Sequence, residues 1–254
     1  MAGHGQDSRL AEMQTSDQGR GWEAVGQLDI GGKGFCTGAL IAENLVLTAA
    51  HCLFDRSSFA QIDHSTVRFL AGLRNGRAQA YRQVRRAVIH PDYNFDGSAT
   101  QTSVDVALLE LERPIRDTKT QPFETGNSPK AGAKVGVVSY AKGRSEAPSI
   151  QEVCSVLGRQ SGSLVMSCDI DFGSSGAPIF TLDDGTPKIV SVVSAKAHMG
   201  DQKVSLGTDL QEPLALLRAQ LAAGKGHFQP QAPKTRNALI SGERRDTGAK
   251  FLKP

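Results

Sequence analysis

The chain has 254 residues, of which 39% are hydrophobic and 22% are charged, and these values are ordinary for a globular protein. This length suits one large all-β unit or two smaller domains. No apolar run approaches the ~20 residues of a membrane-spanning helix, so we expect no membrane partner. Seven basic and two acidic residues from position 225 onward give this tail +5, which leaves the rest of the chain close to −2. The basic excess therefore gives no reason to expect nucleic acid as a partner of the folded part.

Short strand-like segments separated by turns dominate the chain up to about residue 200. Segments this frequent, with turns this short, are typical of barrels and sandwiches rather than of βαβ units. A D-G turn predicts that the segments at 177–182 and 188–197 form a hairpin. The stretch 113–133 is the best candidate for a linker between two β units. The segments expected to form strands are WEAVGQLDI, FCTGALIA, LVLTAA, TVRFLAGL, RQVRRAVIH, VDVALLEL, KVGVVSYA, SLVMSCDI, APIFTL and KIVSVVSAKA.

One helix is predicted, over DLQEPLALLRAQLAAG near the C-terminus. Asp209 is a suitable N-cap, three leucines form an apolar stripe at i, i+3 and i+7, and Gly224 ends the helix. The residues that follow mix proline, glycine and charge without a period, which predicts a disordered basic tail over 225–254.

The four cysteines fall into two local pairs, Cys36 with Cys52 and Cys154 with Cys168. They lack the C-x-x-C spacing of zinc sites, so we expect neither a metal nor a cofactor. Two pairs at loop-sized separations predict two disulfides and an oxidising compartment, secreted or periplasmic. A cytosolic protein with reduced thiols is the alternative. The first residues show no apolar segment of a signal peptide, so we expect a mature chain with an added initiator methionine.

Three short stretches carry residues of nucleophilic catalysis. DFGSSGAPIF places two serines between glycines, and a serine attacks only when a base takes its proton and donors receive the oxyanion. LVLTAAHCL ends in His51, directly before Cys52. VDVALLEL places Asp105 among apolar residues, where a carboxylate is costly to bury without a partner.

Together and in this order, these stretches resemble the trypsin-like, chymotrypsin-fold serine proteases. CTGALIAENLVLTAAHC is similar to the histidine block of that family, VDVALLEL to its aspartate block, and GSSGAP to its nucleophile block. The resemblance covers about residues 22–224. It implies a catalytic triad of Ser175, His51 and Asp105, an oxyanion hole formed by the backbone N–H groups of Gly173 and Ser175, and a Ser194 hydroxyl that reaches the catalytic aspartate.

The resemblance also implies the fold and the domain organisation. We expect an all-β protein of two six-stranded antiparallel β-barrels, with the active-site cleft between them and a C-terminal helix. The expected units are an N-terminal extension at 1–21, a first barrel at 22–120, a second barrel with the helix at 121–224, and the tail. We expect a monomer that acts on protein or peptide substrates through an acyl-enzyme.

The sequence departs from the family's zymogen-activated members at Ser174, where those enzymes carry an aspartate that pairs with a newly cut N-terminus. In this respect it looks closer to bacterial secreted trypsin-like and glutamyl-endopeptidase-like members. Asp169 resembles the buried pocket-floor aspartate that gives trypsin its preference for arginine or lysine at P1. Some glutamyl endopeptidases also carry an aspartate at this spacing, so other P1 preferences stay open, although Val193 replaces the pocket histidine of those enzymes. Lys196 stands where trypsin has glycine at the pocket wall, and an inward-pointing lysine would neutralise Asp169.

Two other functions remain open at this level. A trypsin-like protein with a blocked pocket would bind without cleaving. An α/β-hydrolase esterase would use the same serines as a nucleophile elbow with His198 as base, but it would need a helix directly after them.

Overall fold

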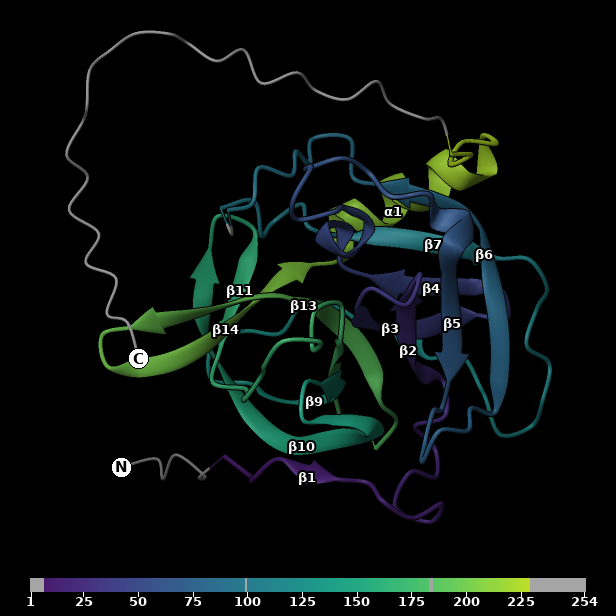
Figure 1. Cartoon of the computed structure of the whole chain (residues 1–254). Coiled ribbons are helices and arrows are strands. Elements are labelled where there is room, and N and C mark those ends of the chain that lie inside the picture. Colours follow the sequence, from purple (N-terminus) through teal and green to yellow (C-terminus); the bar gives the residue numbers. More distant parts are fainter. Residues whose placement is uncertain (1–6, 99, 183–184, 229–254) are drawn as a thin grey trace, which may run out of the picture.

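A computed structural model describes residues 7–98, 100–182 and 185–228. Figure 1 shows two β-barrels side by side, and each is built from one half of the sequence. Both barrels have six strands, all antiparallel within the ring, which confirms the expected fold class.

The first barrel closes on itself in the order β2-β3-β4-β7-β6-β5, because β5 pairs back with β2. Its interior is filled by buried aliphatic side chains such as Leu28, Leu40, Leu47 and Leu108, which are 0% exposed. The six strands are β2 (Val25–Ile30), β3 (Phe35–Ala42), β4 (Leu45–Thr48), β5 (Val67–Ala71), β6 (Ala80–Ile89) and β7 (Ala107–Leu111). Two 3-10 turns, η1 (Ala50–Leu53) and η2 (His64–Thr66), lie between β4 and β5.

The second barrel runs in the order β9-β10-β11-β14-β13-β12, and β12 pairs back with β9. A short strand, β8 (Glu124–Thr125), pairs in parallel with β13 outside this ring. The six strands of the ring are β9 (Lys134–Ala141), β10 (Arg144–Gln160), β11 (Ser163–Met166), β12 (Pro178–Thr181), β13 (Lys188–Met199) and β14 (Gln202–Asp209). The turn of the β12–β13 hairpin lies in part outside the described residues.

The apolar core of the first barrel extends into the second barrel, which also has a core cluster of its own. The main cluster of buried residues continues from the first barrel to Tyr140 on β9 and Phe180 on β12. Trp22 packs edge-on against Phe180, with ring centroids 4.9 Å apart, and Phe123 packs against the same ring at 4.8 Å. Aromatic pairs in such tilted arrangements stabilise beyond their buried area. These ring contacts therefore tie the segments before and after the first barrel to β12 of the second.

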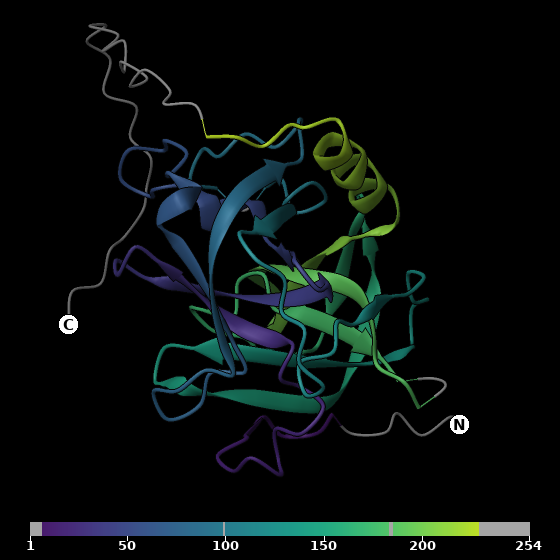
Figure 2. The same ribbon diagram turned by 90° about the vertical axis from the view of Figure 1, so that its right-hand side faces the viewer.

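The predicted C-terminal helix is present as α1 (Gln211–Ala222). Leu214 and Leu217 are buried, and the helix packs against β6 and β7 of the first barrel. Figure 2 shows it on the outside of the molecule. Gly224 follows the helix with φ +76°, as a helix-ending glycine should. The N-cap prediction is wrong by one residue, because Leu210 holds that position and Asp209 ends β14. Among the described residues, no helix has both the length and the apolar character needed to cross a bilayer.

The first described residues attach to the second barrel, not to the first. Strand β1 (Ala11–Glu12) pairs with β10, and in both views this segment runs along that strand. Ser8 donates its backbone N–H to the carbonyl of Val153 at 2.8 Å, and Met13 is buried. The expected N-terminal extension is therefore part of a sheet over these residues. Most of the expected disordered tail, from residue 229 onward, lies outside the described residues.

Candidate active site

His51 and Asp105 lie next to the ends of two neighbouring strands of the first barrel. His51 lies in η1, directly after β4, and Asp105 lies two residues before β7, which pairs with β4. The ring Nδ1 of His51 is 2.7 Å from Asp105 Oδ2, and the backbone N–H of His51 donates to Asp105 Oδ1 at 2.9 Å. Because an ionised carboxylate only accepts hydrogen bonds, Nδ1 carries the proton and Nε2 is left as the basic nitrogen.

The buried carboxylate of Asp105, which is 3% exposed, receives a third hydrogen bond from the second barrel. Ser194, on β13, donates its hydroxyl to Asp105 Oδ2. This is the contact that the sequence analysis expected for Ser194. Hydrogen bonds that favour the charged form offset the cost of removing a carboxylate from water. The arrangement therefore gives the buried carboxylate three hydrogen-bond donors inside an apolar segment.

Ser175 lies in a turn that precedes β12. The backbone N–H of Ser174 donates to the carbonyl of Asp171 at 2.9 Å, and the N–H of Gly176 donates to the carbonyl of Val193 at 2.7 Å. The first bond closes the turn, and the second ties it to β13. Because the chain continues as strand β12 and not as a helix, the α/β-hydrolase alternative is wrong.

The first barrel holds the carbonyl side of the same turn. Thr37, on β3, donates its backbone N–H to the carbonyl of Ser175 at 2.9 Å and its hydroxyl to the carbonyl of Gly173 at 2.9 Å. Gly173 has φ +97°, and a Cβ atom there would lie 2.3 Å from the ring of Phe35. Only glycine fits this position. Among the described residues, neither the N–H of Gly173 nor that of Ser175 donates a hydrogen bond, so both donors are available to an oxyanion.

A cavity of about 410 Å³ lies at this junction and is lined by both barrels. His51, Asp105, Ser175 and Ser194 all contribute to its wall. Aromatic side chains of the first barrel form another part of it, including that of Tyr93. Burial raises the pKa of Tyr93, and the charge of Asp105 adds to the effect, so the phenol stays protonated. His51, Asp105, Ser175 and Ser194 are thus gathered around one cavity between the barrels.

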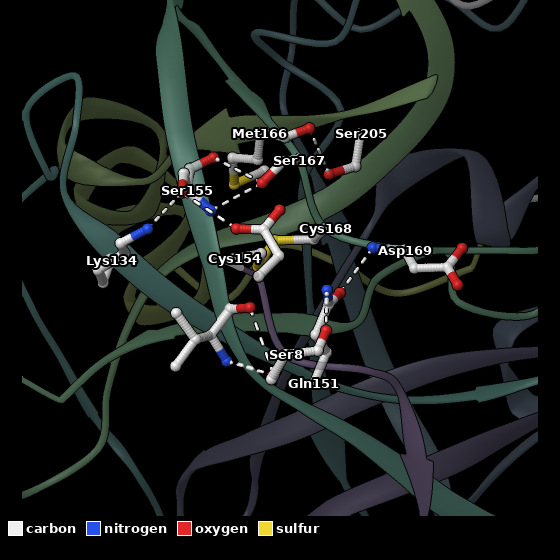
Figure 3. The surroundings of a disulfide bond; sticks show 12 residues. Ser8, Lys134, Gln151, Cys154, Ser155, Met166, Ser167, Cys168, Asp169 and Ser205 are labelled. Atoms are coloured by element: carbon white, nitrogen blue, oxygen red, sulfur yellow. Dashed lines mark hydrogen bonds between the residues drawn. A yellow bond between two sulfur atoms is a disulfide. The ribbon is translucent and has the colours of Figure 1, made fainter. Parts of the chain in front are cut away.

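Asp169 differs from its expected environment. The sequence analysis expected a buried carboxylate, but the side chain is exposed and lines a second cavity of about 560 Å³. The prediction of a buried position is wrong. The backbone N–H of Asp169 donates to the side-chain Oε1 of Gln151 at 2.7 Å, which ties this segment to β10. In Figure 3 the carboxylate points away from the disulfide.

Lys196 contacts the loop before Ser175 and does not pair with Asp169. Its Nζ is 2.9 Å from Asp171 Oδ1 and 4.3 Å from the centroid of the Phe172 ring. The hydrogen bond from Lys196 holds the pKa of Asp171 below its usual value of 3.8. Lys196, Asp171 and Ile170 line both cavities and thus lie between them. Sequence reasoning missed Asp171 and Phe172, although their position shortly before Ser175 could have marked them.

Both expected disulfides are present. Cys36 on β3 is bonded to Cys52, the neighbour of His51, and Cys154 on β10 is bonded to Cys168. Figure 3 shows the second bridge, where Ser8 and Gln151 connect the N-terminal segment to the residue after Cys168. The sulfur atoms of the first bridge lie within 4.8 Å of a ring nitrogen of His51, but bonded sulfurs are not thiolate ligands, so this cluster is no metal site.

Comparisons with known proteins agree with this architecture. The family model described as Trypsin matches residues 13–212. Mast cell protease 3 of Ovis aries is 36% identical over 106 residues, which are 41% of this chain and 38% of that protein. Chymotrypsin-like elastase family member 1 of Homo sapiens is 33% identical over 100 residues, which are 39% of this chain and 35% of that protein. The matched regions thus span little more than a third of these curated relatives.

Among solved structures, that of a Glu endopeptidase in complex with MPD superposes with a TM-score of 0.69 at 17% identity. The match covers 86% of this chain and 98% of that one. At this identity the similarity concerns the fold, and it is the family model, over most of the chain, that establishes the relationship. The chain belongs to the trypsin family of serine proteases.

Proposed function

We propose that this protein is a serine endopeptidase in which Ser175 is the nucleophile, His51 the general base and Asp105 the group that orients the histidine. The observation that carries the proposal is the double hydrogen bond from His51 to the buried carboxylate of Asp105, at the edge of a cavity that Ser175 also lines. A histidine fixed in this tautomer presents a basic Nε2 to a nucleophile.

The reaction follows from these roles. The hydroxyl oxygen of Ser175 attacks the carbonyl carbon of the peptide bond while Nε2 of His51 takes the proton. The N–H groups of Gly173 and Ser175 donate to the oxyanion of the tetrahedral intermediate. His51 then gives the proton to the leaving amine, and an acyl-enzyme remains. Water, deprotonated by the same histidine, attacks the ester carbonyl, and the second tetrahedral intermediate collapses to release the acid and restore Ser175.

For the P1 residue we retain the proposal of arginine or lysine, set by Asp169. Among the described residues no cation lies within ion-pair distance of its carboxylate, whereas Lys196 pairs with Asp171. The internal cation that would have neutralised Asp169 is therefore engaged elsewhere. A cationic side chain that enters from the catalytic cavity would pass the Lys196–Asp171 pair to reach Asp169, because these residues separate the two cavities.

Protein or peptide substrates follow from this chemistry, and the two disulfides support an oxidising compartment outside the cytoplasm. We also propose that the protein acts as a monomer. The direct test of the activity is labelling with a fluorophosphonate probe, followed by peptide mapping of the labelled residue. Label on Ser175, absent from Ser175→Ala and retained by Ser174→Ala, is the expected result. A folded protein that the probe does not label would instead favour the non-catalytic binding function.

A further inference from the structure

A guanidinium group of the second barrel hydrogen-bonds to the turn of residues 171–176, which carries Ser175. Arg144 is the first residue of β10, directly after the tight turn that connects β9 with β10. Its Nη1 donates to the backbone carbonyl of Ser139 at 2.9 Å, and Nη2 donates to the hydroxyl of Ser174 at 3.3 Å. The hydroxyl of Ser139 lies 3.2 Å from both nitrogens. Arg144 therefore joins β9 to the turn that carries Ser175.

The charge of Arg144 has no partner of opposite sign in contact with it. Within the part of the chain that the structure describes, no carboxylate lies within ion-pair distance of this guanidinium. Burial lowers the pKa of Arg144, although the more distant charges of Asp169 and Asp171 oppose this shift. Placing a guanidinium in a partly buried position with only neutral hydrogen-bond acceptors costs free energy. Because a neutral side chain at this position would avoid that cost, we look for a function that requires the guanidinium of Arg144.

Ser174 connects Arg144 to the backbone of the turn. This residue is 0% exposed, and its hydroxyl oxygen accepts the backbone N–H of Asp171 at 3.3 Å as well as the bond from Arg144. The same hydroxyl lies 3.2 Å from that of Ser139 and 3.4 Å from the carbonyl of Tyr140. One buried hydroxyl thus links the guanidinium, strand β9 and the first residue of the turn.

We propose that Arg144 is a positioning residue for the oxyanion-binding turn. Acting through Ser174, it holds residues 171–176 in the conformation that presents the N–H groups of Gly173 and Ser175 to the substrate carbonyl. Thr37, from the first barrel, holds the backbone carbonyl of Gly173, and Arg144, from the second, holds the hydroxyl of Ser174. The inference rests on the proposed function, because it assigns the turn to oxyanion binding. Arg144 acts on the reacting atoms only through Ser174, although it also lines the second cavity together with Asp169.

The kinetic consequence is specific. The two N–H donors act on charge that develops in the transition state, so a loosened turn lowers kcat and kcat/KM together and leaves KM nearly unchanged. Displacing a catalytic group by about 1 Å can cost roughly 10²-fold in rate. For Arg144→Ala we therefore expect a fall in kcat of about 10- to 100-fold, and for Arg144→Lys, which keeps a donor but not the fork, a smaller fall. Millimolar guanidinium should restore part of the kcat of Arg144→Ala but not that of Arg144→Lys.

The control is Arg159→Ala, which removes another arginine from the same strand. Arg159 pairs with Asp209 and lies far along β10 from the turn, so its kcat should stay within about twofold of the parent. A second readout does not depend on activity. Amide hydrogen exchange of a peptide spanning 171–177 should accelerate in Arg144→Ala and not in Arg159→Ala, because bonds such as that from Ser174 N–H to Asp171 weaken.

Unchanged exchange over 171–177, or a kcat of Arg144→Ala within about twofold of the parent, would overturn the inference. A KM increase with kcat unchanged would do the same, because it would place Arg144 in substrate binding. Should Arg144→Ala fail to fold, Arg144→Lys and Ser174→Ala carry the test, since each weakens the link at a different end. A parent protein that neither cleaves peptides nor reacts with the probe would sink the proposed function, while hydrogen exchange would still decide whether Arg144 holds the turn.

Discussion

Asp105 accepts two hydrogen bonds from His51, one from the ring at 2.7 Å and one from the backbone at 2.9 Å. The carboxylate thereby fixes both the ring and the main chain of the same residue. If only the ring of His51 were bonded, its main chain could still move relative to Asp105. Here both the ring Nδ1 and the backbone N–H are bonded to the carboxylate.

Replacing Ser175, His51 or Asp105 by alanine should lower kcat by roughly 10⁴ or more in each case, by analogy with other triads. Ser174→Ala should cost far less, because its hydroxyl is buried behind the turn and supports it without taking part in bond formation. Steady-state kinetics on one peptide substrate measures all four. Equal inactivity of the two serine variants, with both folded, would leave the choice of nucleophile unsupported.

Gly173→Ala should lower kcat by more than tenfold, on the order of one lost oxyanion donor. The added methyl must adopt φ near +97° and displace the Phe35 ring 2.3 Å away. Adding Phe35→Ala removes the clash but not the backbone strain, so it should restore only part of the rate. Full recovery in the double variant would show that crowding alone demands glycine here.

The Cys36–Cys52 bridge should contribute roughly 3 kcal/mol to the free energy of unfolding, from closure of its loop. Replacing both cysteines by alanine should also lower kcat, because the bridge anchors the turn that carries His51. The Cys154–Cys168 pair is the matched control, since its loss should lower stability by a similar amount and act on catalysis through Asp169 instead. Denaturant unfolding and non-reducing peptide mapping check this, and four free thiols in correctly localised protein would contradict the pairing and the compartment.

At P1, Asp169→Ser should abolish a preference for arginine and lysine. Lys196→Gly should leave that preference in place, because Lys196 pairs with Asp171 and not with Asp169. A peptide-library cleavage profile gives both answers, with Asp17→Ser as a control for the loss of one surface charge far from the site. If the basic preference survives Asp169→Ser, another group sets it. If it arises only in Lys196→Gly, Lys196 blocks it in the parent.

Stability should fall at acid pH through Glu110. The hydrogen bond from Arg86 holds the pKa of Glu110 below its usual value of 4.5, and Arg85 adds a second ion pair. A lowered pKa in the folded state means that the unfolded chain binds the proton more readily. The contribution is therefore complete above pH 4.5 and is lost as the pH falls through the folded-state pKa. Thermal unfolding of Glu110→Gln should show a shallower decline than the parent below pH 4.5, and Glu112→Gln, at the exposed neighbouring pair with Arg113, should not.

The parts of the site that could be predicted lie in continuous stretches. Each of these signals lies in a short stretch of sequence: the hydrophobic strands, the two cysteine pairs, and the blocks around His51, Asp105 and Ser175. The pairing of β4 with β7 in the first barrel then brings His51 to Asp105. Spacing predicted the position of Asp169 along the chain but not its exposure, because the contact of its backbone N–H, which donates to Gln151 eighteen positions earlier, is not visible in a local pattern. The Lys196–Asp171 and Arg144–Ser174 contacts join segments that are distant in sequence, so no local sequence pattern predicts them.

The order of the chain through the two barrels has a mechanical consequence. Strand β1 precedes the first barrel yet pairs with the second, and α1 follows the second yet packs on the first. Each barrel is thus contacted by a terminal segment that is joined in sequence to the other barrel. The two barrels cannot separate without the loss of one of these contacts. Both terminal segments therefore limit the width of the cavity between the barrels. A protein cut within the connection at 112–123 and expressed as two pieces should therefore fold only when both pieces are present, and unfold in a single transition once they have joined.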